Sequence, residues 1–366
     1  MTNEEVVEIA SKKLISNVDW RNAYTRYAEG INVKKNIFVE VMKILKKKLP
    51  RRMGLLRIYS SINLAQKTLI EYDLRIFGQS VGSLIIRFDK NNDPQLFLKI
   101  TTKQEDNNDK HLGLKTKANP IRKPYPWDSE EAKQIIDIFT KYSGENANMH
   151  SDEHKMETLI LHDLNKKLKK EGKKLTYVRP VMLGELGYFQ MRTPFGASKH
   201  RTKDYPQYCM RDNGAASGGG IDIFARIQHK DSSWRLAVIE LKDGNTSSES
   251  QPIVMQQALV YATFIAHLLR CEECGNMWYN IFRNQGNEVL LNEKKDKIKI
   301  DVITMMPPIP LNKHGQPIYK EGELNAIDVP GIEGVTLYPY TVYIDADLKK
   351  SLIKNISGTL NNDKKE

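Results

Sequence analysis

Two stretches decide the expected fold: Gly218-Gly219-Gly220-Ile221-Asp222-Ile223-Phe224-Ala225-Arg226 and Ile239-Glu240-Leu241-Lys242. Both are rich in strand-forming residues, and the polar segment 229–233 lies between them, which predicts an antiparallel hairpin. Because side chains two apart on a strand point to the same face, Glu240 and Lys242 are expected to project together. Asp222 falls on the neighbouring strand. Two carboxylates and a lysine at a sheet edge can hold a hard divalent cation and position a water molecule, which suits phosphodiester cleavage.

A predicted helix follows the hairpin and carries Gln257 and Tyr261 four residues apart, so both lie on one helical face. Taken in order, Asp222, Glu240-Leu241-Lys242 and this helix resemble the PD-(D/E)XK nuclease superfamily, which includes restriction endonucleases, phage exonucleases and RecB-type repair nucleases. Gln257-x-x-x-Tyr261 is similar to the QxxxY element of the RecB-like branch. Ile221 stands where the family name has proline. The resemblance covers about residues 148 to 305.

The resemblance implies an α/β fold with a restriction-endonuclease-like mixed-sheet core flanked by helices. It implies catalysis by Asp222, Glu240 and Lys242. It also implies Mg²⁺, with Mn²⁺ able to substitute, held by Asp222, Glu240 and the main-chain carbonyl of Leu241. Gln257 and Tyr261 would support this site and contact the DNA backbone. The implied activity is that of a metal-dependent nuclease acting on DNA, an endonuclease by preference, with a role in restriction, defence or repair.

A third acidic residue is expected from the helix predicted over 151–171. Glu157 falls in its apolar stripe, close to Ile160 and Leu161 on the helical wheel. A glutamate in such a stripe is out of place unless it binds something. Related nucleases use an acidic residue of the first core helix to bind metal, so the resemblance makes Glu157 a candidate ligand. Its position near the start of a helix offers a simpler explanation, since helix starts favour acids.

The long segment 192–220 is predicted to be a loop that carries Lys199 and Arg201. Their charges, with tyrosines interleaved nearby, suit contact with a nucleic-acid backbone. An ordinary surface loop explains the same composition.

The N-terminal part is predicted to be a smaller α+β domain over residues 1–147, preceding a nuclease domain over 148–366 that ends in a polar tail. Residues 1 to about 50 are expected to be helical, with one helix from about Val6 and another over 37–45. An antiparallel meander is expected over 68–100 and a helix over 129–142. In the second domain, strands are expected near 176–183, over 297–305 and over 335–344. The role expected for this first domain is to grip or read the substrate.

Composition favours a basic intracellular protein. The chain has 366 residues and a formal net charge of +11, which favours a polyanionic partner, most simply DNA. Its mean hydropathy is −0.53, and the sequence shows neither a signal-peptide pattern nor an apolar run of the roughly 18 residues that a membrane span needs. Three cysteines favour a reducing compartment, here the cytoplasm.

Two alternatives share these features. One is a nucleic-acid-binding module on a nuclease scaffold without catalysis, and the other is a nuclease specific for RNA or branched DNA. Cutting both strands of a duplex would be easiest for a homodimer, so a dimer is possible.

Overall fold

The computed structural model describes residues 1–33, 43, 56–61, 69–76, 79–91, 93–100, 124–144, 156–161, 178–183, 187–196, 210, 214, 216, 218–229, 233–242, 250–283, 297–309, 311–318, 320 and 322–344. The chain forms two compact units. The first consists of residues 1–28, 160–181 and 190–366, and the second of residues 29–159 and 182–189. These units are not the two consecutive stretches 1–147 and 148–366 expected from the sequence, because the N-terminal residues 1–28 belong with the C-terminal half.

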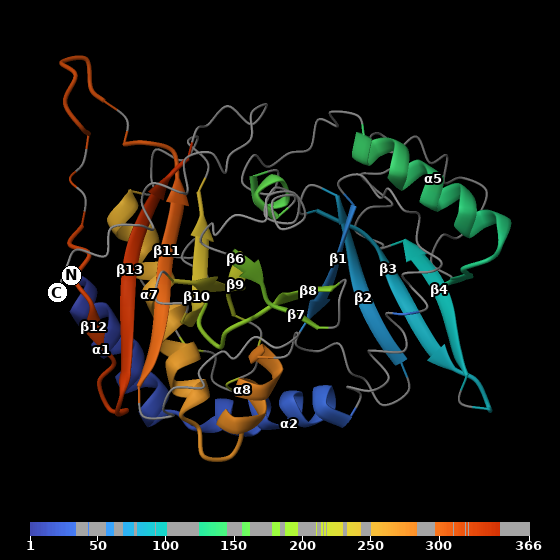
Figure 1. Cartoon of the computed structure of the whole chain (residues 1–366), viewed down its shortest axis with the longest axis horizontal. Helices are drawn as coiled ribbons and strands as arrows, with labels where there is room; N and C mark the ends of the chain where they lie inside the picture. Colours follow the sequence, from blue (N-terminus) through green and yellow to red (C-terminus); the bar gives the residue numbers. More distant parts are fainter. Residues whose placement is uncertain are drawn as a thin grey trace. The chain divides into compact units, whose positions relative to one another are not determined.

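A six-stranded mixed sheet forms the centre of the first unit, in the order β12-β13-β11-β10-β9-β6 (Figure 1). β10 pairs in parallel with β11, and β11 with β13, whereas β9, β6 and β12 join by antiparallel pairing. The strands are β6 (Val178–Pro180), β9 (Ile223–Gln228), β10 (Trp234–Leu241), β11 (Ile298–Met306), β12 (Ile327–Asp328) and β13 (Val335–Tyr343). The two central strands are almost entirely buried, as expected where both faces of a sheet are covered.

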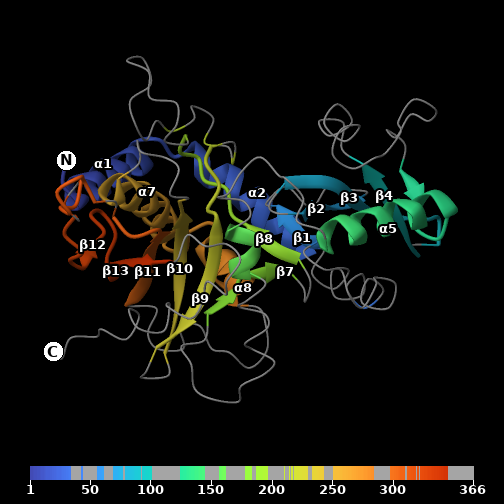
Figure 2. The same cartoon turned by 90° about the horizontal axis from the view of Figure 1, so that it is seen from above.

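Helix α7 (Gln251–Leu269) packs on this sheet and is itself covered by α1 (Asn3–Ser16). Figures 1 and 2 show the two helices side by side. Within the described residues, α7 is the helix long and apolar enough to cross a membrane, contrary to the expectation that no apolar run reaches that length. However, 83% of its most apolar window is buried inside the fold. Such burial is typical of the core helix of a soluble α/β protein.

The N-terminal helices belong to this core through apolar side chains. A capping box starts α1, in which the Thr2 hydroxyl accepts from the Glu5 backbone N–H and the Glu5 carboxylate accepts from that of Thr2. In α2 (Asp19–Val33), Trp20 and Tyr24 are buried and make edge-to-face contacts with Phe264 of α7. The Trp278 indole of α8 (Gly275–Arg283) donates to the backbone carbonyl of Tyr24 at 3.1 Å. The sequence predicted a helical stretch over residues 1 to about 50, but within it only the first of these two helices was described as an element of its own.

The second unit is built on a seven-stranded sheet in the order β5-β4-β3-β2-β1-β8-β7. Helix α5 (Glu130–Gly144) accompanies it, contacting β1, β2 and β5. The strands are β1 (Leu56–Ser61), β2 (Leu69–Ile76), β3 (Gln79–Phe88), β4 (Pro94–Ile100), β5 (Tyr125–Pro126), β7 (Met182–Leu183) and β8 (Gly187–Gln190). β2, β3 and β4 are the predicted meander, paired antiparallel in sequence order.

Most elements predicted from periodicity are confirmed: the meander, α5, the β9–β10 hairpin, α7, β11 and β13. The single strand expected near 176–183 is wrong, because the chain divides there into β6 and β7, which join different sheets. The helix expected over 37–45 lies outside the described residues except for residue 43. Of the helix expected over 151–171, the structure describes residues 156–161, which are helical.

A buried polar cluster fixes the turn end of the β9–β10 hairpin to β11. The His229 ring Nε2 lies 2.7 Å from Asp301 Oδ2, and Arg235 Nη1 lies 3.5 Å from Asp301 Oδ1. The Arg235 guanidinium also stacks over the Tyr338 ring of β13, 4.8 Å from its centroid. Asp301 is fully buried, so these partners compensate the loss of its hydration. The hairpin is thereby held at the end opposite to Glu240.

Candidate active site

The β9–β10 hairpin brings Asp222 and Glu240 to adjacent positions. Its antiparallel register pairs Ile223 with Ile239, and one step further along the pairing sets Asp222 beside Glu240. The Leu241 backbone N–H donates to Asp222 Oδ2 at 2.8 Å. This bond extends the hairpin ladder by a side chain and holds the Asp222 carboxylate at the end of the strand.

Glu240 and Lys242 lie at the carboxyl end of β10, where both side chains are buried, with exposed fractions of 1% and 5%. The Lys242 backbone N–H donates to the carbonyl of Met305 on β11 at 3.0 Å, so the main chain at Lys242 is still fastened to the sheet. Charged side chains are rarely buried unless they have partners. Burial of a carboxylate and an ammonium two residues apart therefore sets these positions apart from solvated surface charges.

Helix α7 reaches this pair through Gln257. Its amide Nε2 donates to Glu240 Oε2 at 2.9 Å and lies 3.4 Å from the Tyr261 hydroxyl. The ring of Tyr261 lies against Gly219, where a Cβ atom would approach the hydroxyl oxygen to 1.8 Å. Any other residue at position 219 would therefore displace the buried Tyr261 ring. Five of the site residues named from the sequence lie in the first unit: Asp222, Glu240, Lys242, Gln257 and Tyr261.

A polar row that the sequence did not suggest continues from Glu240 across the sheet. Thr304 pairs in register with Glu240, and Thr341 pairs with Thr304, so the three side chains share one face. The two threonine hydroxyl oxygens are 3.1 Å apart, and the Gln251 amide of α7 donates to Thr341 Oγ1 at 2.7 Å. The sequence does show a polar residue near the end of each of these strands. It does not show the order of the strands in the sheet, which is needed to align the three residues in a row.

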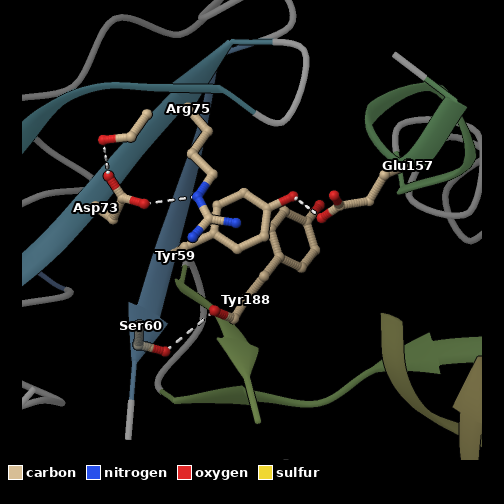
Figure 3. Close-up of polar contacts among 7 residues, drawn as sticks. Tyr59, Ser60, Asp73, Arg75, Glu157 and Tyr188 are labelled. Atoms are coloured by element: carbon tan, nitrogen blue, oxygen red, sulfur yellow. Dashed lines mark hydrogen bonds and ion pairs between the residues drawn. The ribbon is translucent and has the colours of Figure 1, made fainter. Parts of the chain in front are cut away.

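Glu157 belongs to the second unit, where its environment is buried and aromatic (Figure 3). The Tyr59 hydroxyl donates to Glu157 Oε1 at 2.6 Å, and the Tyr59 ring stacks on the Arg75 guanidinium, 4.3 Å from the ring centroid. Burial, followed by the negative charge of Glu157, raises the pKa of Tyr59 well above its usual value. Tyr59 is therefore a hydrogen-bond donor at neutral pH. Its hydroxyl group is the partner that explains why a glutamate occupies the apolar stripe of this helix.

Arg75 is held in the same cluster by Asp73. Its Nε donates to Asp73 Oδ2 at 2.6 Å, while the Ser80 hydroxyl donates to Asp73 Oδ1 at 2.5 Å. Burial alone would lower the pKa of Arg75, but Asp73 first, and then Tyr59 and Glu157, raise it above its ordinary value. The charge of Arg75 thus stabilises a cluster of tyrosine and carboxylate groups around Glu157.

The remaining sequence-predicted residues are Lys199 and Arg201, and both lie outside the described residues. Their proposed contacts with a nucleic-acid backbone stay predictions.

The oxygen donors of the site fit a hard cation. Within the described residues, no group of three or more His, Cys, Asp and Glu side chains is arranged to hold a metal ion. Asp222 and Glu240 nevertheless supply two carboxylates, which the Leu241 N–H and the Gln257 amide hold in place. One or two carboxylates suffice for Mg²⁺, which retains several waters in protein sites. The Leu241 carbonyl and water would complete such a shell.

Comparisons of the chain with models of protein families, with curated proteins and with solved structures found no match. The interpretation of the site therefore depends on its own geometry and chemistry.

Proposed function

We propose that this chain is a metal-dependent nuclease of the PD-(D/E)XK type, with a restriction-endonuclease-like core, that hydrolyses phosphodiester bonds in DNA. One observation carries the proposal. The buried Glu240 carboxylate lies beside Asp222 across the hairpin and accepts a hydrogen bond from Gln257 of α7. Register and hydrogen bonding thus bring Asp222, Glu240 and Gln257 together, which supports the proposal.

In this proposal Asp222, Glu240 and the Leu241 carbonyl hold Mg²⁺, for which Mn²⁺ can substitute. The metal supplies polarisation of the scissile phosphate and a water of lowered pKa. The Asp222 carboxylate is held by the Leu241 N–H, and the Glu240 carboxylate by the Gln257 amide. Ligands fixed in this way lose little orientational freedom on binding a cation. Lys242 orients the attacking water and offsets the negative charge that develops on the phosphate.

DNA is the preferred substrate because the chain carries a net charge of +11, which attracts a polyanion. We place the activity in the cytoplasm, as an endonuclease of restriction, defence or repair. A homodimer would allow both strands of a duplex to be cut.

Incubation with supercoiled plasmid, linear duplex, single-stranded DNA and RNA, each with Mg²⁺, Mn²⁺ or EDTA, tests the proposal. Asp222→Asn and Lys242→Ala should each lower the cleavage rate by about 10²-fold or more. The control is Glu272→Gln, which changes an exposed carboxylate of the same unit and should cleave as the wild type does.

The preferred substrate separates DNA from RNA, and nicked or linear plasmid products separate endonuclease from exonuclease action. Salt-sensitive binding without cleavage under any metal would overturn the catalytic proposal in favour of a binding module. Cleavage that survives both active-site substitutions would show that the activity resides elsewhere.

A further inference from the structure

The corner between α7 and α8 (Figure 1) carries two buried cysteines, Cys271 and Cys274. Their side chains are 8% and 1% exposed, and both are free thiols. The two residues between them, Glu272 and Glu273, are exposed. The corner therefore places two thiols together at the edge of the core, beneath a turn that faces water.

The main chain of this corner has the geometry of a single helical turn. The Gly275 N–H donates to the Cys271 carbonyl at 2.7 Å, a hydrogen bond of α-helical spacing that spans both cysteines. In α-helical geometry, Cα atoms three residues apart are separated by about 5 Å. A disulfide accepts Cα separations of about 4.4–6.8 Å. The main chain therefore already has the geometry that a bond between the two sulfurs needs.

The turn also packs closely against the end of α7. A Cβ atom at position 275 would approach the carbonyl oxygen of Leu269 to 2.6 Å, so the glycine allows this close approach. On the other side, Trp278 of α8 donates to the Tyr24 carbonyl of α2 at 3.1 Å. The two cysteines are thus held between three packed helices, which keeps them next to each other.

The environments of the two thiols differ. The Cys274 carbonyl accepts from the Trp278 N–H at 3.0 Å, so Cys274 begins α8, where the helix dipole stabilises a thiolate. A hydrogen bond from Cys271 lowers the pKa of Cys274, and the positive charge of Arg21 acts in the same direction. The Cys271 thiol also donates to Glu273 Oε2 at 3.0 Å. Hydrogen bonding to Cys274, followed by burial, raises the pKa of Cys271.

We propose that the Cys271–Cys274 pair is a site of reversible oxidation, at which hydrogen peroxide converts the two thiols to a disulfide. In the first step the Cys274 thiolate attacks one peroxide oxygen. An S–O bond forms, the O–O bond breaks, and the leaving hydroxide takes the proton that the Cys274 thiol had released, giving water. Cys274 is then a sulfenic acid.

In the second step the sulfur of Cys271 attacks the sulfur of Cys274. The S–S bond forms and the S–O bond breaks, and the leaving hydroxide takes the Cys271 proton as a second water. Two thiols are oxidised and one peroxide is reduced to two waters. A thiol reductant returns the pair to its starting state.

The burial of the pair favours a small oxidant. Cys274 is almost fully covered, so peroxide, a molecule only slightly larger than water, reaches it more readily than a bulky disulfide reagent does. In the reducing compartment expected from the sequence, disulfides are transient and redox-sensing rather than structural. The inference goes beyond the nuclease proposal and does not depend on it.

The test uses the full chain with Cys209→Ser, which leaves Cys271 and Cys274 as its two cysteines. The reduced, folded protein is treated with hydrogen peroxide, alkylated with N-ethylmaleimide in denaturant and analysed by peptide mass spectrometry. The peptide that contains both cysteines should lose two hydrogen atoms and take up no maleimide. Dithiothreitol added before alkylation should restore uptake at both positions.

Two further substitutions in the same protein assign the steps. Cys271→Ser should stop at the sulfenic acid of Cys274, which dimedone traps, because the second thiol is missing. Cys274→Ser should lose dimedone labelling, because the remaining thiol has a raised pKa. Thermal unfolding of both variants checks that the corner is intact, and the result for the protein with both cysteines is independent of this check.

Three outcomes would overturn the inference. Uptake of two maleimides after peroxide treatment would show that the folded corner is not oxidised. Sulfinic acid at either cysteine, without a disulfide, would show that the second thiol does not reach the first. Equal dimedone labelling of Cys271→Ser and Cys274→Ser would overturn the assignment of Cys274 as the attacking thiol. None of these readouts involves nucleic acid, so failure here leaves the nuclease proposal standing.

Discussion

Among single residues, Gln257 has the clearest expected effect because it joins α7 to Glu240. Gln257→Ala removes the donor to Glu240 Oε2 and leaves a buried carboxylate with one partner fewer. The loss of a hydrogen bond to a buried charged group is expected to cost about 1–3 kcal/mol of unfolding free energy. Loss of an orienting partner of a metal ligand is expected to lower cleavage by about 10–100-fold. Urea unfolding and plasmid cleavage measure the two effects.

Gln256 provides the matched control for this prediction. It is the preceding residue of the same helix, and its amide donates to the Met1 carbonyl at an exposed position. Gln256→Ala should change stability by less than about 0.5 kcal/mol and leave cleavage unchanged. If Gln257→Ala loses stability but cleaves at the wild-type rate, its contact with Glu240 is structural only.

Glu157 has two possible roles that one conservative substitution separates. As the acceptor of the Tyr59 hydroxyl, it can be replaced by glutamine, whose carbonyl oxygen still accepts. If Glu157 is instead the metal ligand that the sequence suggested, glutamine cannot replace it, because the negative charge is lost. We expect Glu157→Gln to keep near-wild-type cleavage and stability, and Glu157→Ala to lose about 1–3 kcal/mol of stability because the buried Tyr59 hydroxyl is left without this acceptor. Cleavage that falls steeply in Glu157→Gln at unchanged stability would restore the metal-ligand interpretation.

At the scale of elements, the docking of α1 on α7 contains a titratable group. Ser11 of α1 donates its hydroxyl to the Pro330 carbonyl, so the hydroxyl oxygen accepts from His267 Nε2 of α7, 2.7 Å away. Burial, and secondarily the positive charge of Arg21, lowers the pKa of His267 from 6.5 to about 4. The neutral ring with its proton on Nε2 is therefore the form that the folded protein favours.

The consequence is a loss of stability on acidification. Between pH 6.5 and about 4, the unfolded chain binds a proton at His267 that the folded chain does not, so stability falls as the pH falls through this window. A shift of this size corresponds to at most about 3 kcal/mol. His267→Gln keeps a donor for Ser11 but does not titrate, so its unfolding free energy should depend less steeply on pH.

Urea unfolding at intervals from pH 4 to pH 7.5 measures this difference, since other titrating groups are common to both proteins. Gln256→Ala, at an exposed position of the same helix, serves as the control and should follow the wild-type curve. Parallel curves for the wild type and His267→Gln would exclude His267 as the source of acid sensitivity.

Elements with strong local signals were predictable from the sequence. The β9–β10 hairpin combines strand-forming runs with a polar turn, and α7 combines a long apolar run with Gln257 and Tyr261 on one face, so both were placed correctly. β1 was missed, and α2 was not separated as an element within the helical N-terminal stretch, because its pattern includes a glycine and six aromatic or β-branched residues. The division of 176–183 into β6 and β7 could not be predicted, because two short adjacent strands give one local signal while their partners lie far away in sequence.

For the candidate site, residue types and spacing were predictable and supporting contacts were not. Asp222 and Glu240 follow from alternation on neighbouring strands. The Gln257 contact with Glu240 required the packing of α7 on the sheet, and the Thr304–Thr341 row required the strand order. Tyr59 as the partner of Glu157 lies 98 residues away in sequence, a separation over which periodicity carries no information. Local pattern therefore identifies candidate groups, and tertiary pairing decides what holds them.

At the scale of the whole molecule, the first unit is closed by residues from both ends of the chain. The Asn3 side-chain amide donates to the Glu323 carbonyl at 2.6 Å, and Gln256 donates to the Met1 carbonyl at 2.9 Å. Val6, Val7 and Leu14 of α1 are fully buried. A composition-based boundary at residues 144–147 cannot detect this, because α1 has an ordinary amphipathic sequence whose partner is more than 200 residues distant.

A fragment of residues 148–366, the nuclease domain expected from the sequence, should therefore not fold as the full chain does. Without α1 and α2 it exposes the apolar surface of α7 that Val6, Val7 and Leu14 cover, and burying such side chains contributes roughly 1.5–3 kcal/mol each. The summed loss is comparable to the whole stability of a typical domain, about 5–15 kcal/mol. We expect the fragment to aggregate or to bind a hydrophobic dye, and a peptide of residues 1–33 added in trans to restore cooperative unfolding. The control peptide carries Val6→Asp and Leu14→Asp in α1 and should fail to restore it. A fragment that unfolds cooperatively at the full-length midpoint without the peptide would show that the C-terminal region is an independent domain.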